Sequence, residues 1–351
     1  MDGVGVVGIP ACGIPKSPHG ATANRSFATL LHTLVVSHAG PRRLCRGDIR
    51  TARLVRAQGA SQQQQGRQGG ARARGVLQLH LLRRLCDSEG SLPDASRWAV
   101  DLGTQYDGGP AQWGTGEVET YTDDWQNVRI TADCTLKMTP VRGDDGSWTS
   151  SRVETTAGWD FACAAGERLR VEAGIRLGDN PEARSLGIWP AFWALGSDYR
   201  GNYQNWPAVG EVDILESVNG LGRVWHAAHC GANPGGACDE PSGIARVTDP
   251  YERGAWHTVA WEVDRSGWGQ ESMSWYVDGD VQWTLWEEDV DDADAWHALV
   301  ANSKMILLNV AVGGGFPDGV SGTTTPTYDT LDGDGASMEV DYVAVYLEGG
   351  W

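Results

Sequence analysis

Apolar and polar residues alternate in short runs along the chain from about residue 86, and Gly, Asp, Asn and Pro separate these runs. In the clearest run, 168–177, the odd positions are mostly apolar and the even positions mostly polar. Successive side chains of a strand point to opposite faces, so this run predicts a half-buried antiparallel strand. Residues 259–263 repeat the alternation, whereas 305–312 and 338–346 are more continuously apolar and predict central strands.

A hairpin is predicted near residue 280. The alternation of residues 273–277 ends at Asp278-Gly279, and apolar residues alternate again over 281–283. An Asp-Gly pair favours the tight two-residue turn of a hairpin. Long helical periodicity is absent from the sequence. Many short strands with turn signals therefore predict an all-β fold, a two-sheet antiparallel β-sandwich of the jelly-roll kind.

The charge balance divides the chain into two segments. Residues 1–84 hold 13 Lys and Arg against two acidic residues, whereas the remainder holds 15 against 44, which gives net charges of +11 and −29. The front segment also contains a Gln- and Gly-rich stretch at 61–70 and no sustained period. We therefore expect 1–84 to be mostly disordered and 85–351 to be the folded domain. Alternatively, the front is a mispredicted gene start that replaces a signal peptide.

Composition narrows the class of ligand. An acidic domain is a poor partner for nucleic acid or anionic membranes, whose phosphates require clustered Lys and Arg. No apolar stretch is long enough to predict a membrane-spanning helix. The 17 Trp outnumber the 4 Phe and 9 Tyr, although core volume alone would favour more Phe. Because Trp offers a flat face and one N–H, this bias favours a neutral sugar ligand, with ordinary core packing as the alternative for any single Trp.

Seven cysteines cannot all pair within one chain. Cys230 and Cys238 flank a Gly- and Pro-containing loop that could close into a small disulfide ring, which would suit an oxidising compartment. The remaining five have no metal-ligand spacing and no predicted pairing: Cys12, Cys45, Cys86, Cys134 and Cys163.

Three acidic residues lie in one apolar segment, Glu211-Val-Asp213-Ile-Leu-Glu216. On a regular strand Glu211 and Asp213 share a face, and Glu216 would point into the core, where an unpaired carboxylate is costly. A β-bulge across Ile214-Leu215 would return Glu216 to the acidic face. The bulge therefore decides whether the three acids line one cleft.

Such a trio fits the chemistry of a retaining glycosidase. That reaction needs one carboxylate to attack the anomeric carbon and one carboxyl group to protonate the leaving oxygen, about 5–5.5 Å apart. Asp213, between the two, could tune the proton affinities so that Glu216 keeps its proton while Glu211 is charged. The alternative is that acids alternating on a strand form an ordinary solvated face.

The hexapeptide at 211–216 resembles the signature of glycoside hydrolase family 16, in the bulged form of its laminarinase-like members. The resemblance covers residues from about 87 to 346 and is closest to fungal endo-1,3(4)-β-glucanases. Residues 108–122 and 187–195 resemble the family's early and central cleft strands, and 229–240 the loop after its catalytic strand.

The resemblance implies a jelly roll whose concave face is a substrate cleft. It implies that Glu211 is the nucleophile, Asp213 the assisting acid and Glu216 the acid/base. It further implies sugar-binding roles at six positions, with Trp189 or Trp193 facing the core as an alternative: Trp206, Trp189, Trp193, Glu117, Arg152 and His229. No cofactor is required, and Asp341 stands where one ligand of a structural calcium would be.

Three positions depart from the family pattern. Residues 225–229 read Trp-His-Ala-Ala-His where the family more usually has Trp-Gly-Thr-Leu-His, so His226 replaces a glycine and could distort that strand. Phe316 replaces a frequent Trp, which puts one sugar contact in question. The opening strand resembles the family only from about Asp87 onward.

The resemblance implies a monomeric, secreted retaining endo-β-glucanase that hydrolyses internal β-1,3 bonds of β-glucan, with mixed β-1,3/1,4 glucan as an alternative substrate. The apolar patch Phe27–Val36 makes a poor signal peptide. Two other functions are open. A cell-wall transglycosylase would pass the same intermediate to a sugar hydroxyl, and a β-glucan-binding protein would not turn it over. The presence of both Glu211 and Glu216 argues against the second.

Overall fold

The computed structural model describes residues 77–82, 88–267 and 270–348, and for 77–82 it describes the backbone alone. The chain divides into two units, Met1–Arg72 and Ala73–Trp351, and the described residues all belong to the second. The expectation that 1–84 is disordered therefore falls mostly outside the described residues. Within that segment, β1 (Leu77–Leu82) pairs antiparallel with β18.

One large sheet is eight-stranded and antiparallel, with the order β16-β15-β14-β9-β18-β5-β4 and β1 beside β18. Its strands after β1 are β4 (Val128–Ile130), β5 (Leu136–Met138), β9 (Arg168–Leu177), β14 (Trp256–Asp264), β15 (Ser272–Val277), β16 (Asp280–Trp286) and β18 (Met338–Glu348). We call it the outer sheet.

The other large sheet is seven-stranded, with the order β13-β12-β11-β10-β17-β8-β2. Its strands are β2 (Trp98–Asp101), β8 (Arg152–Thr155), β10 (Ile188–Gly196), β11 (Glu211–Glu216), β12 (Val224–His229), β13 (Ile244–Thr248) and β17 (Lys304–Val312). We call it the cleft sheet, because one of its faces carries the site described below.

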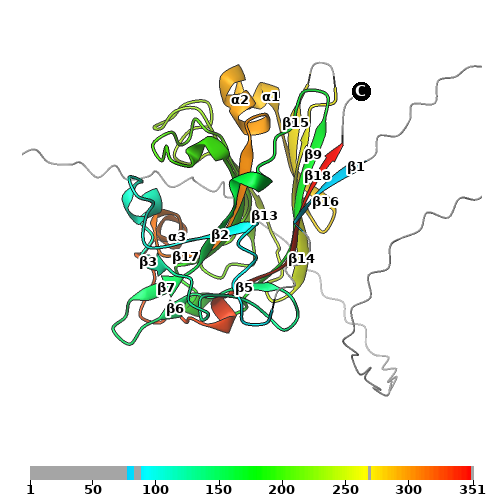
Figure 1. Ribbon diagram of the computed structural model, residues 1–351. Coiled ribbons are helices and arrows are strands. Elements are labelled where there is room, and N and C mark those ends of the chain that lie inside the picture. Colours follow the sequence, from blue (N-terminus) through cyan, green and yellow to red (C-terminus); the bar gives the residue numbers. More distant parts are fainter. Residues whose placement is uncertain (1–76, 83–87, 268–269, 349–351) are drawn as a thin grey trace, which may run out of the picture. The chain divides into compact units, whose positions relative to one another are not determined.

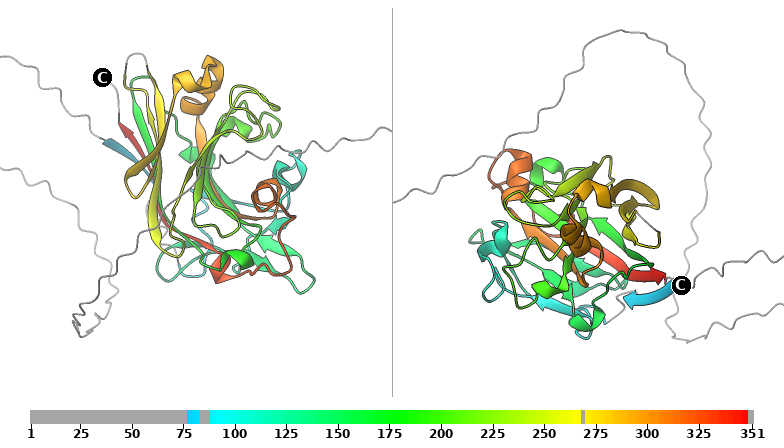
Figure 2. Two further views of the ribbon diagram at one scale, coloured as in Figure 1. Left: turned by 180° about the vertical axis from the view of Figure 1, so that it is seen from behind. Right: turned by 90° about the horizontal axis from the view of Figure 1, so that it is seen from above.

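The two large sheets lie face to face as two layers (Figures 1 and 2). Apolar side chains fill the space between them. Ile175 and Trp261 of the outer sheet and Phe192, Leu215 and Leu308 of the cleft sheet are at most 1% exposed and belong to one buried cluster. Every residue of β17 is buried, as expected for a central strand. The predicted all-β sandwich is confirmed.

Smaller elements surround the sandwich. A three-stranded sheet, in the order β3-β7-β6, consists of β3 (Glu119–Tyr121), β6 (Val141–Arg142) and β7 (Trp148–Ser150). The helices are α1 (Glu287–Val290), α2 (Ala293–Val300) and α3 (Gly315–Ser321), and α1 and α2 lie together at one end of the sandwich (Figure 1). Short 3-10 turns are η1 (Ala111–Gly114), η2 (Ala157–Trp159), η3 (Glu182–Arg184), η4 (Ser197–Tyr199) and η5 (Asp334–Ala336).

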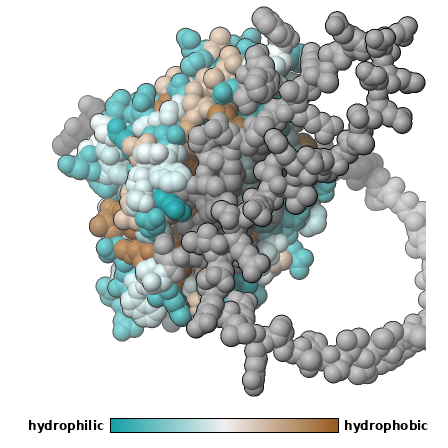
Figure 3. Space-filling view, turned by 45° about the vertical axis from the view of Figure 1, so that its right-hand side comes forward, coloured by the Kyte–Doolittle hydropathy of each residue, from teal (hydrophilic) through white to brown (hydrophobic). Residues whose placement is uncertain are grey.

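The strands predicted from alternation are present. The run at 168–177 is β9, and the predicted hairpin is β15–β16. Its turn residues Asp278 and Gly279 both have positive φ, 53° and 86°, which a two-residue turn of this kind requires. No helix among the described residues is long and apolar enough to cross a membrane. Hydrophilic and hydrophobic areas are interspersed on the face that Figure 3 shows.

Candidate active site

A cleft of about 340 Å³ lies on the cleft sheet. Side chains from β8, β10, β11 and β17 form its floor. It is lined by eight of the nine residues predicted for catalysis and sugar binding: Glu117, Arg152, Trp189, Trp193, Trp206, Glu211, Asp213 and Glu216. The ninth, His229, contacts Asp213 from the neighbouring strand. The structure thus brings all nine into one region.

The predicted bulge in β11 is present. Across β10, Trp193 pairs with Asp213 and Phe192 with Leu215, so Ile214 is left without a partner. Across β12, the regular pairing also shifts between Asp213 and Glu216. The extra residue places Glu216 on the face of Glu211 and Asp213, and all three carboxyl groups line the cleft.

The residue before the strand has to be glycine. Gly210 has φ +79°, and a Cβ there would lie 2.2 Å from the carbonyl oxygen of Ala298 in α2. A larger residue would therefore separate α2 from the start of β11, where Glu211 is placed.

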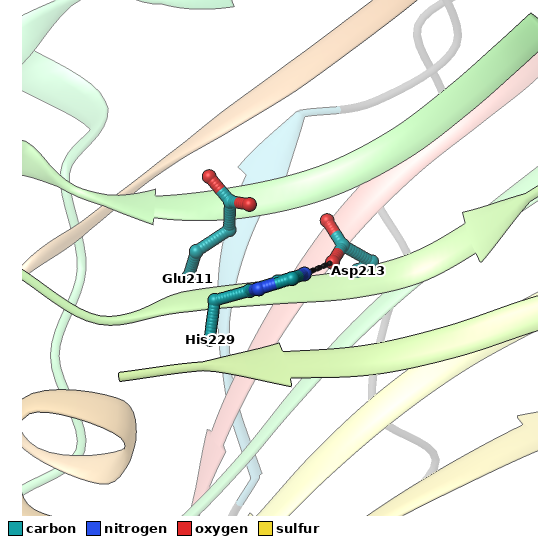
Figure 4. A group of neighbouring side chains, drawn as sticks. All are labelled: Glu211, Asp213 and His229. Atoms are coloured by element: carbon teal, nitrogen blue, oxygen red, sulfur yellow. Dashed lines mark ion pairs between the residues drawn. The ribbon is translucent and has the colours of Figure 1, made fainter. Parts of the chain in front are cut away.

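An ion-paired chain of three side chains runs beside the nucleophile candidate. His229 Nε2 lies 3.2 Å from Asp213 Oδ2, and His229 Nδ1 lies 2.8 Å from Glu240 Oε2. Figure 4 shows the imidazole pointing at Asp213, with the Glu211 carboxyl group on the same side of the strands. Asp213 is therefore held by a cation that is itself held by a second carboxylate.

Glu240 is a site residue that the sequence analysis did not identify. Its side chain is fully buried, and its other oxygen, Oε1, accepts a hydrogen bond of 2.8 Å from the Cys230 N–H. Cys230 and Cys238 form a disulfide, the pair favoured from the sequence, and this ring ends two residues before Glu240. Gly243 leaves room for the His229 ring, because a Cβ there would lie 2.7 Å from its Cε1.

Each of the two proposed catalytic glutamates has an indole partner. Trp189 Nε1 donates a hydrogen bond of 2.9 Å to Glu216 Oε1. Trp206 hydrogen-bonds to Glu211, and its ring centroid lies 5.7 Å from that of His229. Trp189 therefore faces the cleft, as does Trp193, whose Nε1 donates to Asn309 Oδ1 at 2.8 Å. The alternative that one of them faces the core is wrong.

The electrostatics of the cleft favour protonated carboxyl groups. Burial, and after it the neighbouring Asp213 charge, raises the pKa of Glu211 to about 8. Burial and then Asp213 also raise the pKa of Glu216 well above its ordinary value. Burial alone would lower the pKa of His229, but hydrogen bonds to Asp213 and Glu240 raise it well above its usual range. The imidazole is therefore cationic at neutral pH.

Neighbouring side chains also hold Arg152 and Glu117, two of the residues predicted to bind sugar, in place. Arg152 is buried and paired with Asp101 at 3.0 Å, and its guanidinium lies 4.5 Å from the Trp113 ring centroid and 4.9 Å from that of Trp193. Glu117 accepts hydrogen bonds of 2.7 Å from Tyr121 and Thr115. Both side chains are rigidly positioned in the cleft wall before any ligand binds.

Further cleft aromatics were not predicted. Tyr106 stacks on Tyr203 with ring centroids 4.4 Å apart, and Trp113 meets Tyr106 edge-on at 4.8 Å. All three line the cleft. Tyr106 and Tyr203 lie outside the sequence segments that resemble the family's cleft strands, and Tyr203 follows the 3-10 turn η4. Only the folded structure therefore shows that they are cleft residues.

The departures from the family pattern have specific environments. Phe316 lies between Trp189 and Trp225, with ring centroids 5.5 Å from each. It packs edge-on against both rings, of which Trp189 lines the cleft. His226 does not distort β12, because every residue from Val224 to Ala228 pairs in register with β13. Its ring is fully buried and hydrogen-bonded at both nitrogens.

Metal binding was considered at two places. Ligand atoms of Glu211, Asp213 and His229 all lie within 4.8 Å of one another, although carboxylates already engage both nitrogens of His229. Asp341 lies at a register shift in β18 opposite β9. Within the described ranges, it belongs to no group of three such ligands. Calcium at Asp341 therefore stays a prediction.

Comparison with known families gives an independent assignment. The model of a family described as "XgeA-like, catalytic GH16 domain" matches residues 179–245, which include β10, β11 and β12. The matched segment thus contains the three acidic residues and His229.

Three relatives extend the match. The β-glucanase of Rhodothermus marinus is 30% identical over 73% of this chain and 80% of its own length. Glucan endo-1,3-beta-glucosidase A1 of Niallia circulans is 27% identical over 74% of this chain, which spans only 36% of that protein. The crystal structure of an endo-1,3-beta-glucanase from Streptomyces sioyaensis superposes with a TM-score of 0.74 at 41% identity, over 80% of this chain and all of that one. The chain belongs to glycoside hydrolase family 16.

Proposed function

We propose that this protein is a retaining endo-β-glucanase that hydrolyses internal β-1,3 bonds of a glucan chain. The observation that carries the proposal is the bulged strand β11, which presents Glu211, Asp213 and Glu216 together in a Trp-lined cleft. The relatives named glucan endo-1,3-beta-glucosidase A1 and endo-1,3-beta-glucanase support the same linkage.

The first step breaks the glycosidic bond. The Glu211 carboxylate attacks the anomeric carbon while Glu216 gives its proton to the departing glycosidic oxygen, and a glycosyl ester forms on Glu211. The raised pKa of Glu216 supports its part, because the acid has to hold a proton at the working pH. Glu211 has to be ionised to attack, and because its pKa is raised to about 8, the reactive carboxylate forms as the pH rises toward that value. The His229 cation limits the rise that burial causes.

The second step releases the sugar. Glu216, now a carboxylate, takes a proton from water, the hydroxide oxygen bonds to the anomeric carbon, and the ester bond to Glu211 breaks. The two inversions return the original configuration. His229, which Glu240 holds in turn, keeps the Asp213 side chain in place through both steps.

Flat aromatic faces support a sugar polymer as the substrate. Trp113, Trp189, Trp193, Trp206 and Tyr203 all line the cleft, and pyranose rings pack their C–H faces on such surfaces. The acidic domain offers no clustered cations for a phosphate-rich polymer.

The test measures reducing ends released from a β-1,3 glucan and, separately, from a mixed β-1,3/1,4 glucan. We expect turnover by the wild type and its loss in Glu211→Gln. Glu262→Gln, on the outer sheet, is the matched control. Equal turnover by wild type and Glu211→Gln would refute the proposal, as would tight glucan binding without turnover by folded protein. Products longer than the starting oligosaccharide would instead assign transglycosylation.

We further propose a secreted, monomeric protein that needs no cofactor for its chemistry. The Cys230–Cys238 disulfide supports an oxidising compartment. Sedimentation measures the oligomeric state. Thermal unfolding with and without a chelator tests the predicted calcium site at Asp341. An unchanged melting temperature would contradict that prediction.

A further inference from the structure

The β11 bulge turns two backbone carbonyl groups out of the sheet and into the core. Trp275 Nε1 of β15 donates a hydrogen bond of 2.9 Å to the Asp213 carbonyl oxygen. His226 Nδ1 of β12 lies 2.8 Å from the Ile214 carbonyl oxygen. Both side chains are completely buried. Each of these two carbonyl groups thus has its own side-chain partner. Trp275 comes from the outer sheet and His226 from the cleft sheet.

The partners of His226 fix its tautomer. A carbonyl oxygen can only accept, so Nδ1 carries the hydrogen, and Nε2 lies 2.9 Å from the Thr248 hydroxyl oxygen. Burial lowers the pKa of His226 to about 4, so the ring is neutral at the pH of an ordinary assay. It therefore acts as a fixed donor, unlike the cationic His229 three residues later.

We propose that His226 and Trp275 are positioning residues that hold the bulge in register and so keep Glu216 on the same cleft face as Glu211 and Asp213. This inference rests on the proposed function. Neither side chain lines the cleft, and each acts only through the backbone of Asp213 and Ile214.

The physical reason is the competition between two registers. Without the extra residue, β11 would be a regular strand and Glu216 would face the core. A buried carbonyl without a partner disfavours the bulged form, whereas a matched donor stabilises it. The sequence suggested that His226 could distort its own strand, β12. Instead, its side chain supplies a partner for a carbonyl group in the bulge of the neighbouring strand, β11.

The experiment compares substitutions that keep or remove the donor at the Nδ1 position. The amide nitrogen of Asn can occupy that position, whereas the longer Gln places its amide nearer Nε2, so His226→Asn and His226→Gln form a matched pair. His226→Leu removes both bonds. Trp275→Phe keeps a ring but removes the hydrogen bond to Asp213. His257→Asn, a histidine of the outer sheet that bonds to Asp278, is the control.

We expect His226→Gln, His226→Leu and Trp275→Phe to lower kcat on a β-1,3 glucan by roughly 10- to 100-fold, with KM nearly unchanged. The basic limb of the pH profile, which reports the proton on Glu216, should shift in the same variants. His226→Asn should retain most of the wild-type kcat and pH profile. Melting curves identify any variant that fails to fold, and the Asn and Phe variants then carry the comparison.

Two results separate the failures. An inactive wild type would refute the proposed function itself. An active wild type with the same kcat and pH profile in folded His226→Gln and Trp275→Phe would overturn the positioning role alone. An equal loss in His226→Asn and His226→Gln would also overturn it, because the Nδ1 donor would then not matter.

Discussion

The outward face of β9 and the cleft face of β11 both carry charged residues at alternating positions, yet their electrostatics differ. On β9, Arg170 pairs with Glu172 at 2.9 Å and with Glu262 of β14 at 3.5 Å, and Arg168 pairs with Asp264. On β11, the acids have no arginine partner among the ion pairs of the described residues, and His229 is the cation beside them.

The pKa values follow from this difference. Burial raises the pKa of Asp264, but hydrogen bonds from Arg168 and Ser266 outweigh it and leave the pKa lowered. Burial, and after it the charge of Asp213, raises the pKa of Glu211 to about 8, although the His229 cation opposes the rise. Alternating charged residues thus form a neutralised face on the outer sheet and a proton-holding site on β11.

The largest expected contrast is in catalysis. Glu211→Gln and Glu216→Gln each remove a group that makes or breaks a covalent bond or moves a proton. We expect each to lower kcat/KM on a β-1,3 glucan by at least roughly 1,000-fold. Glu172→Gln on the outer sheet should change it less than about twofold. A comparable loss in Glu172→Gln would erase the distinction between the faces.

The next contrast concerns Glu240. Glu240→Gln leaves a neutral partner at His229, so the imidazole loses part of the interaction that keeps it cationic next to Asp213. We expect kcat to fall roughly 10- to 100-fold, as for residues that orient a functional group. Asp239→Asn, an exposed neighbour in the same loop, is the control and should retain activity. Wild-type kinetics in Glu240→Gln would show that Asp213 needs no such support.

The third contrast concerns how the free energy of unfolding depends on pH. The pKa of Glu211 is raised from an ordinary 4.5 to about 8, so the folded protein keeps this proton over a range in which the unfolded chain loses it. The stability contributed by this proton is complete below pH 4.5 and is lost as the pH rises through 8.

Glu211→Gln cannot ionise and escapes that loss. Because Glu211 is partly open to the cleft, we expect the variant to be more stable than wild type by roughly 1–3 kcal/mol at pH 8. The two proteins should converge near pH 4.5. Denaturant unfolding at both pH values measures the difference, and a constant gap would contradict the raised pKa.

The smallest effect is expected on the outer sheet. Arg168→Met removes the pair with Asp264, and the Arg168 side chain is 49% exposed. We expect a loss of about 1 kcal/mol or less in the free energy of unfolding, with kcat unchanged. A larger loss, or any change in kcat, would mean that these surface pairs do more than neutralise charge.

Local pattern was sufficient to predict much of the fold. The alternation at 168–177 predicted β9, and Asp278-Gly279 predicted the β15–β16 turn. The bulge in β11 followed from the cost of burying Glu216. In each case the deciding interaction is between neighbours in sequence or between a side chain and the core.

What the sequence analysis missed depends on distant pairing. The Cys230–Cys238 disulfide ring lies between His229 and Glu240 in sequence and brings the two side chains together. No motif in the sequence around Glu240 indicates that it pairs with His229. His226 was expected to disturb β12, since its partner, the Ile214 carbonyl oxygen, exists only once the bulge of the next strand is present. Tyr106 reaches Glu154 at 2.8 Å across 48 residues of sequence.

The configuration of the first product tests the central claim most directly. Proton NMR during the earliest turnover of a β-1,3 glucan distinguishes the anomers of the newly formed reducing end before they equilibrate. Double displacement through Glu211 predicts that the β-anomer appears first and the α-anomer later, by mutarotation. Initial appearance of the α-anomer would mean a single displacement by water, and Glu211 would then not be the nucleophile.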